Sequence, residues 1–432
     1  MASLKASATR LGGGLPASYW KLWAASAASN LADGVFWIAL PLLALQLTDS
    51  PALIAGVAFA SRLPWLLFAL VAGALADRLD RRRTMLLVDL VRAALLAGLT
   101  AAVVADVATM PVLYLAAFLL GVFETLFDTS AQSIMPNLVE RDLLSRANGR
   151  LYAVELTMNQ FVGPPVGGFL AALGLASAFG LTALAYLLAA LFLLTIVGSF
   201  RPVREGPPTR LHHEIAEGLR YLFRHPVLRV LAIMVGISNL GSAAVFAIFV
   251  VYAVAPGPLG LDEVGFGILM TGFAIGSLVG SFLVERLERR LGRANLLAIS
   301  MGTTAVMTAL PAFTTSALVV GASFVAGGLL GVAWNVVTVS LRQRIVPDRL
   351  LGRVNASYRL LAWGTMPLGA ALGGAIGQLV GIQAVFLVAG AMTAFLVAGR
   401  LVITEQAIAA AELEGAARPE SSPEASPEAR EA

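Results

Sequence analysis

Ionisable side chains interrupt several long apolar stretches of this chain. Asp33 lies in "SNLADGVFW", and Glu124 lies in "GVFETLFD". Each is about 13 residues from an end of its stretch, near the middle of a helix of that length at ~1.5 Å per residue. An apolar surrounding favours the neutral acid over the carboxylate, so such a group can bind and release a proton. We predict that Asp33 and Glu124 are proton-binding groups.

Other charges in these stretches have structural explanations. Arg62 lies at a depth that would allow an ion pair with Asp33, and this pair is the alternative to a proton-binding role for Asp33. Asp89 and Arg92 are one helical turn apart and are expected to pair with each other. The charges near the middle of a stretch all lie in the first half of the chain, so we expect the ionisable site there.

Two more acids are open to a structural interpretation. Asp128 lies one turn beyond Glu124, and we expect it to pair with the arginine-rich segment 78–83. Glu155 and Asn159 would share one helix face, where a packing hydrogen bond and a place in a cavity both remain open.

The elements that must position these groups are membrane-spanning helices. Hydrophobic residues make up 58% of the chain and charged residues 13%, and the mean hydropathy is +0.82. A soluble core could not bury that much apolar surface. A bilayer core of about 30 Å requires about 20 helical residues for each crossing. We therefore predict an all-α membrane protein, in contact with the lipid bilayer, with twelve transmembrane helices. The apolar stretches are 20–46, 52–75, 84–104, 111–131, 147–172, 177–199, 229–254, 264–284, 294–313, 317–339, 356–379 and 382–404.

The distribution of Lys and Arg predicts the topology. Basic residues precede the first stretch and fill every second loop after it, whereas the alternate loops contain none. Because basic residues near span ends stay on the cytoplasmic side, both termini are expected to be cytoplasmic. The first stretch lacks an evident cleavage site, so we expect it to remain as a span. The loops without Lys or Arg are 47–51, 105–110, 173–176, 255–263, 314–316 and 380–381.

Internal repeats divide the spans into two halves of the same orientation. "ADRLDRRR" at 76–83 recurs as "VERLERRL" at 284–291, and "SNLADGVF" at 29–36 recurs as "SNLGSAAVF" at 238–246. Parallel repeats of this kind are typical of secondary transporters. The predicted parts are a cytoplasmic segment 1–19, a six-helix bundle 20–199, a linker 200–228 with an amphipathic helix, a second six-helix bundle 229–404, and a disordered cytoplasmic tail 405–432.

The arginine-rich segment between the second and third stretches carries a family resemblance. Its motif consists of Gly73, Asp77, Arg78, Arg81 and Arg82. It resembles the loop signature of the major facilitator superfamily. Asp80 stands where this family usually has Gly, and in this departure the chain resembles the branch of enterobactin-type siderophore exporters and macrolide or multidrug efflux proteins. The charges of this loop can pair with helix ends and with acids on adjacent helices. Such contacts would hold the two halves together on one side of the membrane and must break when that side opens. A topological anchor with no gating role is the alternative.

A second motif lies in the fifth stretch and resembles the antiporter motif of exporters in the same superfamily. It consists of Gly163, Pro164, Pro165, Gly167 and Gly168 in "GPPVGG". Proline removes a backbone donor and bends a helix, and glycine allows a neighbouring helix to approach closely. A packing motif without directional meaning is the alternative.

The substrate cavity predicted from the sequence is aromatic and mostly neutral. No Lys or Arg cluster reaches its predicted middle, which favours a bulky, partly lipophilic solute. The candidate lining residues are Asn30, Phe36, Trp37, Asn239, Ser242, Trp334 and Asn335, with Ser238 beside them.

These features predict a proton-coupled exporter of a hydrophobic or amphiphilic small molecule, such as a drug, macrolide or siderophore. The chain contains no phosphate-binding loop and no hydrolytic arrangement, so we expect neither ATP use nor enzyme activity. It has no cysteine and three histidines, and we expect no metal, cofactor or nucleic-acid partner. A monomer in the inner (cytoplasmic) membrane is expected. An importer or facilitator of the same fold, and a non-transporting sensor or scaffold, are the alternatives.

Overall fold

Helices make up almost all of the described chain. The computed structural model describes residues 14–76, 79–198, 200 and 211–416. Within these residues, eleven helices are long and apolar enough to cross a membrane. The sequence therefore correctly predicts an all-helical membrane protein.

The described residues of the first half form seven α-helices. They are α1 (Ala17–Leu47), α2 (Pro51–Ala76), α3 (Arg81–Val104), α4 (Met110–Leu138), α5 (Leu144–Leu156), α6 (Gly163–Leu173) and α7 (Leu175–Leu194). A 3-10 turn, Arg141–Leu143, precedes α5. Asp80 begins α3, because its side chain accepts the backbone N–H of Arg83 at 3.0 Å and satisfies one free donor of the first turn.

Between residues 211 and 416, the described part of the second half, there are eight more α-helices. They are α8 (Leu211–Arg224), α9 (Pro226–Ala253), α10 (Glu263–Leu291), α11 (Arg293–Ala309), α12 (Ala317–Ile345), α13 (Asp348–Leu379), α14 (Ile382–Phe395) and α15 (Glu405–Ala416). Short 3-10 segments, Leu310–Ala312 and Leu396–Leu401, extend α11 and α14. The predicted amphipathic helix of the linker is α8, which ends two residues before α9 begins.

One predicted span is interrupted. The stretch 147–172 corresponds to α5, a π-helical segment Thr157–Val162, and α6. Pro164 and Pro165 follow the π-helical segment and cannot donate backbone hydrogen bonds to the preceding turn, so the helix loses its regular ladder there. The predicted stretch 147–172 is therefore the one that has no counterpart among the eleven described helices that are long and apolar enough to cross a membrane.

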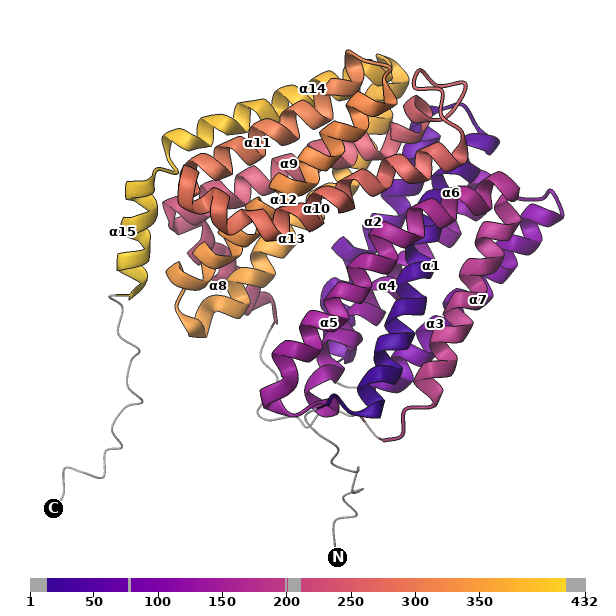
Figure 1. Cartoon of the computed structure of the whole chain (residues 1–432), viewed down its shortest axis with the longest axis horizontal. Coiled ribbons are helices and arrows are strands. Elements are labelled where there is room, and N and C mark those ends of the chain that lie inside the picture. Colours follow the sequence, from indigo (N-terminus) through magenta and orange to yellow (C-terminus); the bar gives the residue numbers. More distant parts are fainter. Residues whose placement is uncertain (1–13, 77–78, 199, 201–210, 417–432) are drawn as a thin grey trace, which may run out of the picture. The chain divides into compact units, whose positions relative to one another are not determined.

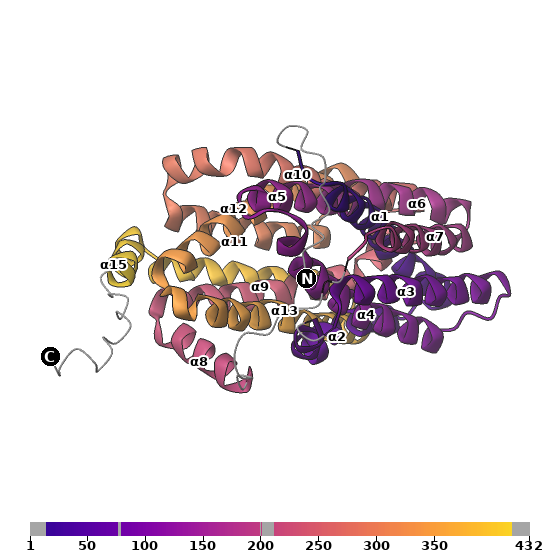
Figure 2. The same ribbon diagram turned by 90° about the horizontal axis from the view of Figure 1, so that it is seen from below.

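Contacts divide the chain into two compact units. The first unit contains Met1–Gly206, Phe246–Ala274 and Gly373–Leu379. In this unit α3 packs against both α4 and α7, while α1 packs against α7 and α2 packs against α4 (Figures 1 and 2). Leu22, Met85 and Phe127 are among the buried side chains of its inner core. The charged groups predicted to form the site lie on these helices.

The second unit contains Pro207–Val245, Ile275–Leu372 and Val380–Ala432. Here α11 packs against α12 and α14, and α12 packs against α15. Leu231, Leu297 and Val337 are buried in its core. α8 joins this core through Leu222, which is fully buried.

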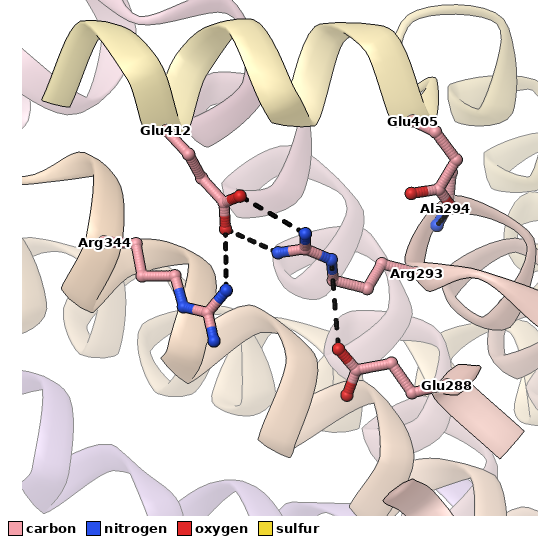
Figure 3. A network of polar contacts seen from close by, with 6 residues as sticks. All are labelled: Glu288, Arg293, Ala294, Arg344, Glu405 and Glu412. Atoms are coloured by element: carbon pink, nitrogen blue, oxygen red, sulfur yellow. Dashed lines mark hydrogen bonds and ion pairs between the residues drawn. The ribbon is translucent and has the colours of Figure 1, made fainter. Parts of the chain in front are cut away.

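The last described helix, α15, differs from the predicted disordered tail. Glu412 lies between Arg293 of α11, at 2.5 Å, and Arg344 of α12, at 3.4 Å (Figure 3). Glu405 accepts the backbone N–H of Ala294 at 2.7 Å, in the first turn of α11. Glu412 thus has two basic partners, and Glu405 accepts a backbone N–H at the start of a helix, so residues 405–416 are ordered although their composition resembles a tail. Residues 417–432 lie outside the described chain.

Candidate functional site

A small pocket in the first unit brings two of the predicted acids together. Asp33 of α1 and Glu124 of α4 both line it. The cavity volume open to the centre of a water molecule is about 20 Å³, which suffices for a water but not for a drug-sized solute. The other lining residues are Phe36, Trp37, Leu40, Ser61, Ala117, Leu120, Gly121 and Tyr186. In this conformation the pocket can hold water or a proton beside two carboxylates and three aromatic rings.

Asp33 is held by two partners from other helices. The hydroxyl of Tyr186 on α7 donates a hydrogen bond of 2.5 Å to Asp33 Oδ1. Arg92 Nη1 on α3 lies 3.8 Å from the same oxygen, and the Asp33 side chain is 17% exposed. The expected pair of Asp33 with Arg62 is not formed, because Arg92 occupies the position beside the carboxylate. Asp33 is therefore oriented by a neutral donor and a cation, with one side left accessible.

Arg92 lies at the centre of the buried charges. Its side chain is 1% exposed, and the guanidinium carbon lies 5.1 Å from the Tyr186 ring centre and 5.4 Å from that of Phe127. Asp89 Oδ1 is 4.0 Å from Arg92 Nη1, so the ion pair expected from their spacing is present. Aromatic rings on two sides restrict the directions in which this guanidinium can move.

Arg62 has a different role from the predicted one. Its guanidinium carbon lies 4.0 Å from the centre of the Trp37 ring, an arrangement that favours a cation over the face of the indole. Glu124 and Asp128 are the acids that act electrostatically on it. Arg62 thus places a positive charge beside the second acid of the pocket.

Asp128 and Glu155 both contact the surroundings of the pocket. Asp128 interacts electrostatically with the buried charges Glu124, Asp33 and Arg92. Its expected pairing with the arginine-rich segment stays a prediction, because Asp77 and Arg78 lie outside the described residues. Glu155 accepts a hydrogen bond of 3.3 Å from Ser26 of α1, which is a packing bond between two helices. Both acids therefore belong to the surroundings of the pocket.

The glycines of the "GPPVGG" motif lie against other helices without intervening side chains. A Cβ at Gly34 of α1 would lie 2.4 Å from the Asn159 carbonyl oxygen and 2.9 Å from Gly163 Cα. A Cβ at Gly168 would lie 2.3 Å from the Glu263 carbonyl oxygen, at the start of α10. Gly167 faces Val35 and Ile38 of α1.

Pro164 is buried, and its carbonyl oxygen would lie 2.3 Å from a Cβ at Gly267 of α10. Pro165 follows in the first turn of α6 and is half-buried.

The arginine-rich segment ties the ends of helices together. Arg82 donates to the last carbonyl groups of α7, from Nε to Leu193 at 2.7 Å and from Nη2 to Leu194 at 2.8 Å. Arg81 donates to the Asn137 side chain on α4 at 3.1 Å. Gly73 lies in the last turns of α2, and Asp77 and Arg78 lie outside the described residues.

The remaining predicted cavity residues do not line this pocket. Asn30 donates to the Ser26 carbonyl at 2.9 Å within its own helix. Asn239 donates to the Ala362 carbonyl at 2.7 Å, which joins α9 to α13 in the second unit. Trp334 is buried in the core of the second unit, whereas Asn335 is exposed and Ser242 is half-buried. Of the predicted lining, only Phe36 and Trp37 accompany Asp33 and Glu124 in this pocket.

Two polar residues of the pocket were not predicted from the sequence. Tyr186 and Ser61 line the pocket but carry no charge, and a hydroxyl in an apolar stretch is common enough to give no signal on its own. Ser177 and Thr182 are further hydroxyl groups of the same helix, so the hydroxyl of Tyr186 does not stand out in its sequence. Among the described residues no group of three acids, histidines or cysteines could hold a metal ion.

Comparison with known proteins gives matches along most of the chain. The model of the family described as transmembrane secretion effector matches residues 17–427. The multidrug efflux pump Tap of Mycolicibacterium fortuitum is 29% identical over 377 residues, which cover 84% of this chain and 90% of that protein. The Tap pump of Mycobacterium tuberculosis is 30% identical over 375 residues, covering 82% and 86%. The enterobactin exporter EntS of Escherichia coli is 24% identical over 317 residues, covering 72% and 73%.

Solved transporter structures share the fold. The nucleoside transporter NupG matches with a TM-score of 0.73 at 14% identity, over 89% of this chain and 98% of that one. A bacterial homologue of the iron transporter ferroportin, in an inward-facing state, matches with a TM-score of 0.66 at 15% identity, over 90% and 99%. At these identities the likeness concerns the fold alone.

Proposed function

Because this chain belongs to the transmembrane secretion effector family of the major facilitator superfamily, we propose that it is a proton-coupled exporter of a hydrophobic or amphiphilic small molecule. It is a multi-pass membrane transporter and not an enzyme. Relatives named as a multidrug efflux pump and as an enterobactin exporter support export over import.

The observation that carries proton coupling is the environment of Asp33. Its Oδ1 atom accepts a hydrogen bond from Tyr186 and faces Arg92, while Glu124 lines the same pocket. An ionised carboxylate is stabilised by both partners, and a protonated one frees Arg92 to move. Asp33 and Glu124 are the groups that exchange protons for substrate in this proposal.

The proposed topology has twelve spans and both termini in the cytoplasm. The helix interrupted at Thr157–Val162 is the fifth span in chain order and completes the count of twelve. In it, α5, the π-helical segment and α6 together cover the apolar stretch 147–172. The alternation of basic and uncharged loops supports this orientation. The proposed location is the inner (cytoplasmic) membrane, with the chain acting as a monomer.

The proposed switch between states involves the antiporter motif and the arginine-rich segment. Gly163 packs on Gly34, the neighbour of Asp33, so a movement of α6 reaches the ionisable site through backbone contact. Arg82 holds the end of α7, the helix that carries Tyr186. Both motifs are thus linked to the pocket through the helices that line it.

Ethidium uptake into inverted membrane vesicles tests this proposal. With an imposed proton gradient, wild-type vesicles are expected to accumulate the dye, and Asp33→Asn is expected to reduce this accumulation at least tenfold. Asp106→Asn is the matched control, because Asp106 is exposed outside the pocket and its positive φ of 55° suits asparagine. Gradient-driven uptake that survives in Asp33→Asn would contradict the assigned role of Asp33.

The direction of transport is tested in the same vesicles. If wild-type vesicles accumulate neither ethidium nor a panel of lipophilic drugs and siderophores, the proposed export is wrong. If substrate moves out of inverted vesicles along the proton gradient, the chain is an importer.

A further inference from the structure

A second buried acid, Asp89, lies near Asp33 but outside the pocket. Asp89 of α3 is 0% exposed, and neither of its carboxylate oxygens has a hydrogen-bond partner among the described residues. It does not line the pocket that Asp33 and Glu124 share. A buried carboxylate without hydrogen bonds is unfavourable, so this position requires either a cation or a proton.

One guanidinium serves both acids. Arg92 Nη1 lies 3.8 Å from Asp33 Oδ1 and 4.0 Å from Asp89 Oδ1. Both distances exceed the ~2.7–2.9 Å of a charge-assisted hydrogen bond. Arg92 Nη1 and Nε have no hydrogen-bond partner among the described residues. A shift of about 1 Å would therefore let Arg92 bind either carboxylate directly, at the expense of the other.

We propose that Asp33 and Asp89 share one proton and one arginine, and that Asp89 is the second acceptor of the coupling proton. This inference rests on the proposed proton-coupled export. When Asp33 is ionised, Arg92 binds it and Asp89 carries the proton. When this proton passes from Asp89 to Asp33, the O–H bond at Asp89 breaks as the one at Asp33 forms, and Arg92 moves to Asp89. In each exchange one O–H bond forms and one breaks, and the cluster keeps its charge.

The charged surroundings support sharing over two fixed pairs. The groups that act on the cluster are Tyr186 from α7, Glu124 and Asp128 from α4, and the three members on α1 and α3. Among the described residues, Arg92 is the cation that forms ion pairs with both Asp33 and Asp89, whereas Arg62 acts on Glu124 and Asp128. If Asp33 and Asp89 were both ionised, two buried negative charges would share one cation. The Ser29 hydroxyl of α1 is the neutral donor that acts on Asp89.

The position of Asp89 gives the exchange a direction. Counted from helices that both begin on the proposed cytoplasmic side, Asp89 is the ninth residue of α3 (Arg81–Val104), whereas Asp33 is the seventeenth residue of α1 (Ala17–Leu47). Transfer from Asp33 to Asp89 would therefore carry the proton from the pocket towards the inner side.

Infrared spectroscopy of the purified chain tests the shared proton without transport. The measured quantity is the C=O absorption of protonated carboxyl groups at neutral pH. Asp33→Asn and Asp89→Asn are each expected to remove one group from this signal, because the remaining acid then pairs with Arg92. The double variant is expected to remove no more than either single variant, and Asp106→Asn to remove none. An unchanged signal in Asp89→Asn, or a double loss twice the single one, would overturn the proposal.

If Asp89→Asn does not fold, removing the positive charge of Arg92 tests the shared proton instead. Arg92→Gln leaves both acids without a cation, so the signal should increase by one protonated group. No increase in a folded Arg92→Gln protein contradicts the sharing of Arg92.

Transport in vesicles supplies the functional readout. Asp89→Asn should reduce gradient-driven ethidium accumulation at least tenfold, and full accumulation would contradict the inference. A wild-type chain that exports nothing would refute the proposed function. The infrared signal of protonated carboxyl groups would still show whether Asp33 and Asp89 share a proton.

Discussion

Gly34 of α1 and Gly163 of α6 pack backbone against backbone, one residue away from Asp33. A Cβ on Gly163 would lie 2.6 Å from Gly34 Cα, and one on Gly34 would lie 2.4 Å from the Asn159 carbonyl oxygen. No side chain can be added at either position unless the helices separate. The contact therefore joins the π-helical segment and the antiporter motif to the helix that carries the ionisable site.

Gly34→Ala tests this contact. We expect a loss of about 1–3 kcal/mol in the free energy of unfolding, because the added methyl group forces backbone atoms apart. Gradient-driven ethidium uptake should fall in parallel. The matched control is Gly98→Ala in α3, where a Cβ would meet nothing within 4 Å. That substitution should be neutral or stabilising by up to about 1 kcal/mol, since alanine favours a helix. Equal thermal stability of the two variants in detergent would refute the close contact.

Tyr186→Phe tests the orientation of Asp33. The phenylalanine ring can still lie beside Arg92, but the 2.5 Å hydrogen bond to Asp33 is lost. A hydrogen bond to a charged group contributes about 1.5–3 kcal/mol, so we expect at least a fivefold decrease in gradient-driven uptake. Tyr114→Phe is the control, because it removes a 2.8 Å hydrogen bond to the Leu53 carbonyl outside the pocket. Similar uptake by the two variants would show that Tyr186 only packs.

Arg82→Lys distinguishes two roles of Arg82: hydrogen bonding to the end of α7, and orienting the chain in the membrane by its positive charge alone. Arg82 reaches two carbonyl groups at the end of α7, whereas a lysine offers a point charge without the planar fork. We expect lower thermal stability and a decrease of several-fold in transport, with the orientation in the membrane unchanged. Arg83→Lys, at an exposed position beside it, should leave both properties at the wild-type level. If Arg82→Lys also behaves as wild type, the positive charge alone suffices.

Glu412→Gln tests the docking of α15. Its carboxylate is 20% exposed and faces Arg293, which is 22% exposed, and Arg344, which is 60% exposed (Figure 3). The exposed partner contributes little because water screens it, so we expect a loss of about 1 kcal/mol, mainly from Arg293. Faster hydrogen exchange over residues 405–416 would report the release of α15. Glu414→Gln, exposed on the same helix, is the control and should leave exchange unchanged.

The sequence predicted the helices well because their signal is local. Apolar stretches long enough to cross a bilayer, and loops that alternate in Lys and Arg, are visible without any knowledge of packing. The interrupted span at 147–172 was less predictable, because the effect of Pro164 and Pro165 appears in the turn before them. The order of α15 was missed because Glu405 and Glu412 find their partners more than 60 residues away.

The sequence by itself determined that the charges near the middle of the apolar stretches lie in the first half of the chain, and which residues carry them. Only the tertiary structure decided the pairing: Arg92 rather than Arg62 reaches Asp33, and Tyr186 completes the site. Depth along a helix follows from residue number, but the face on which a side chain meets its neighbour depends on how α1, α3 and α7 pack together. The packing of these helices therefore decides that Asp33 meets Arg92 of α3 and not Arg62 of α2.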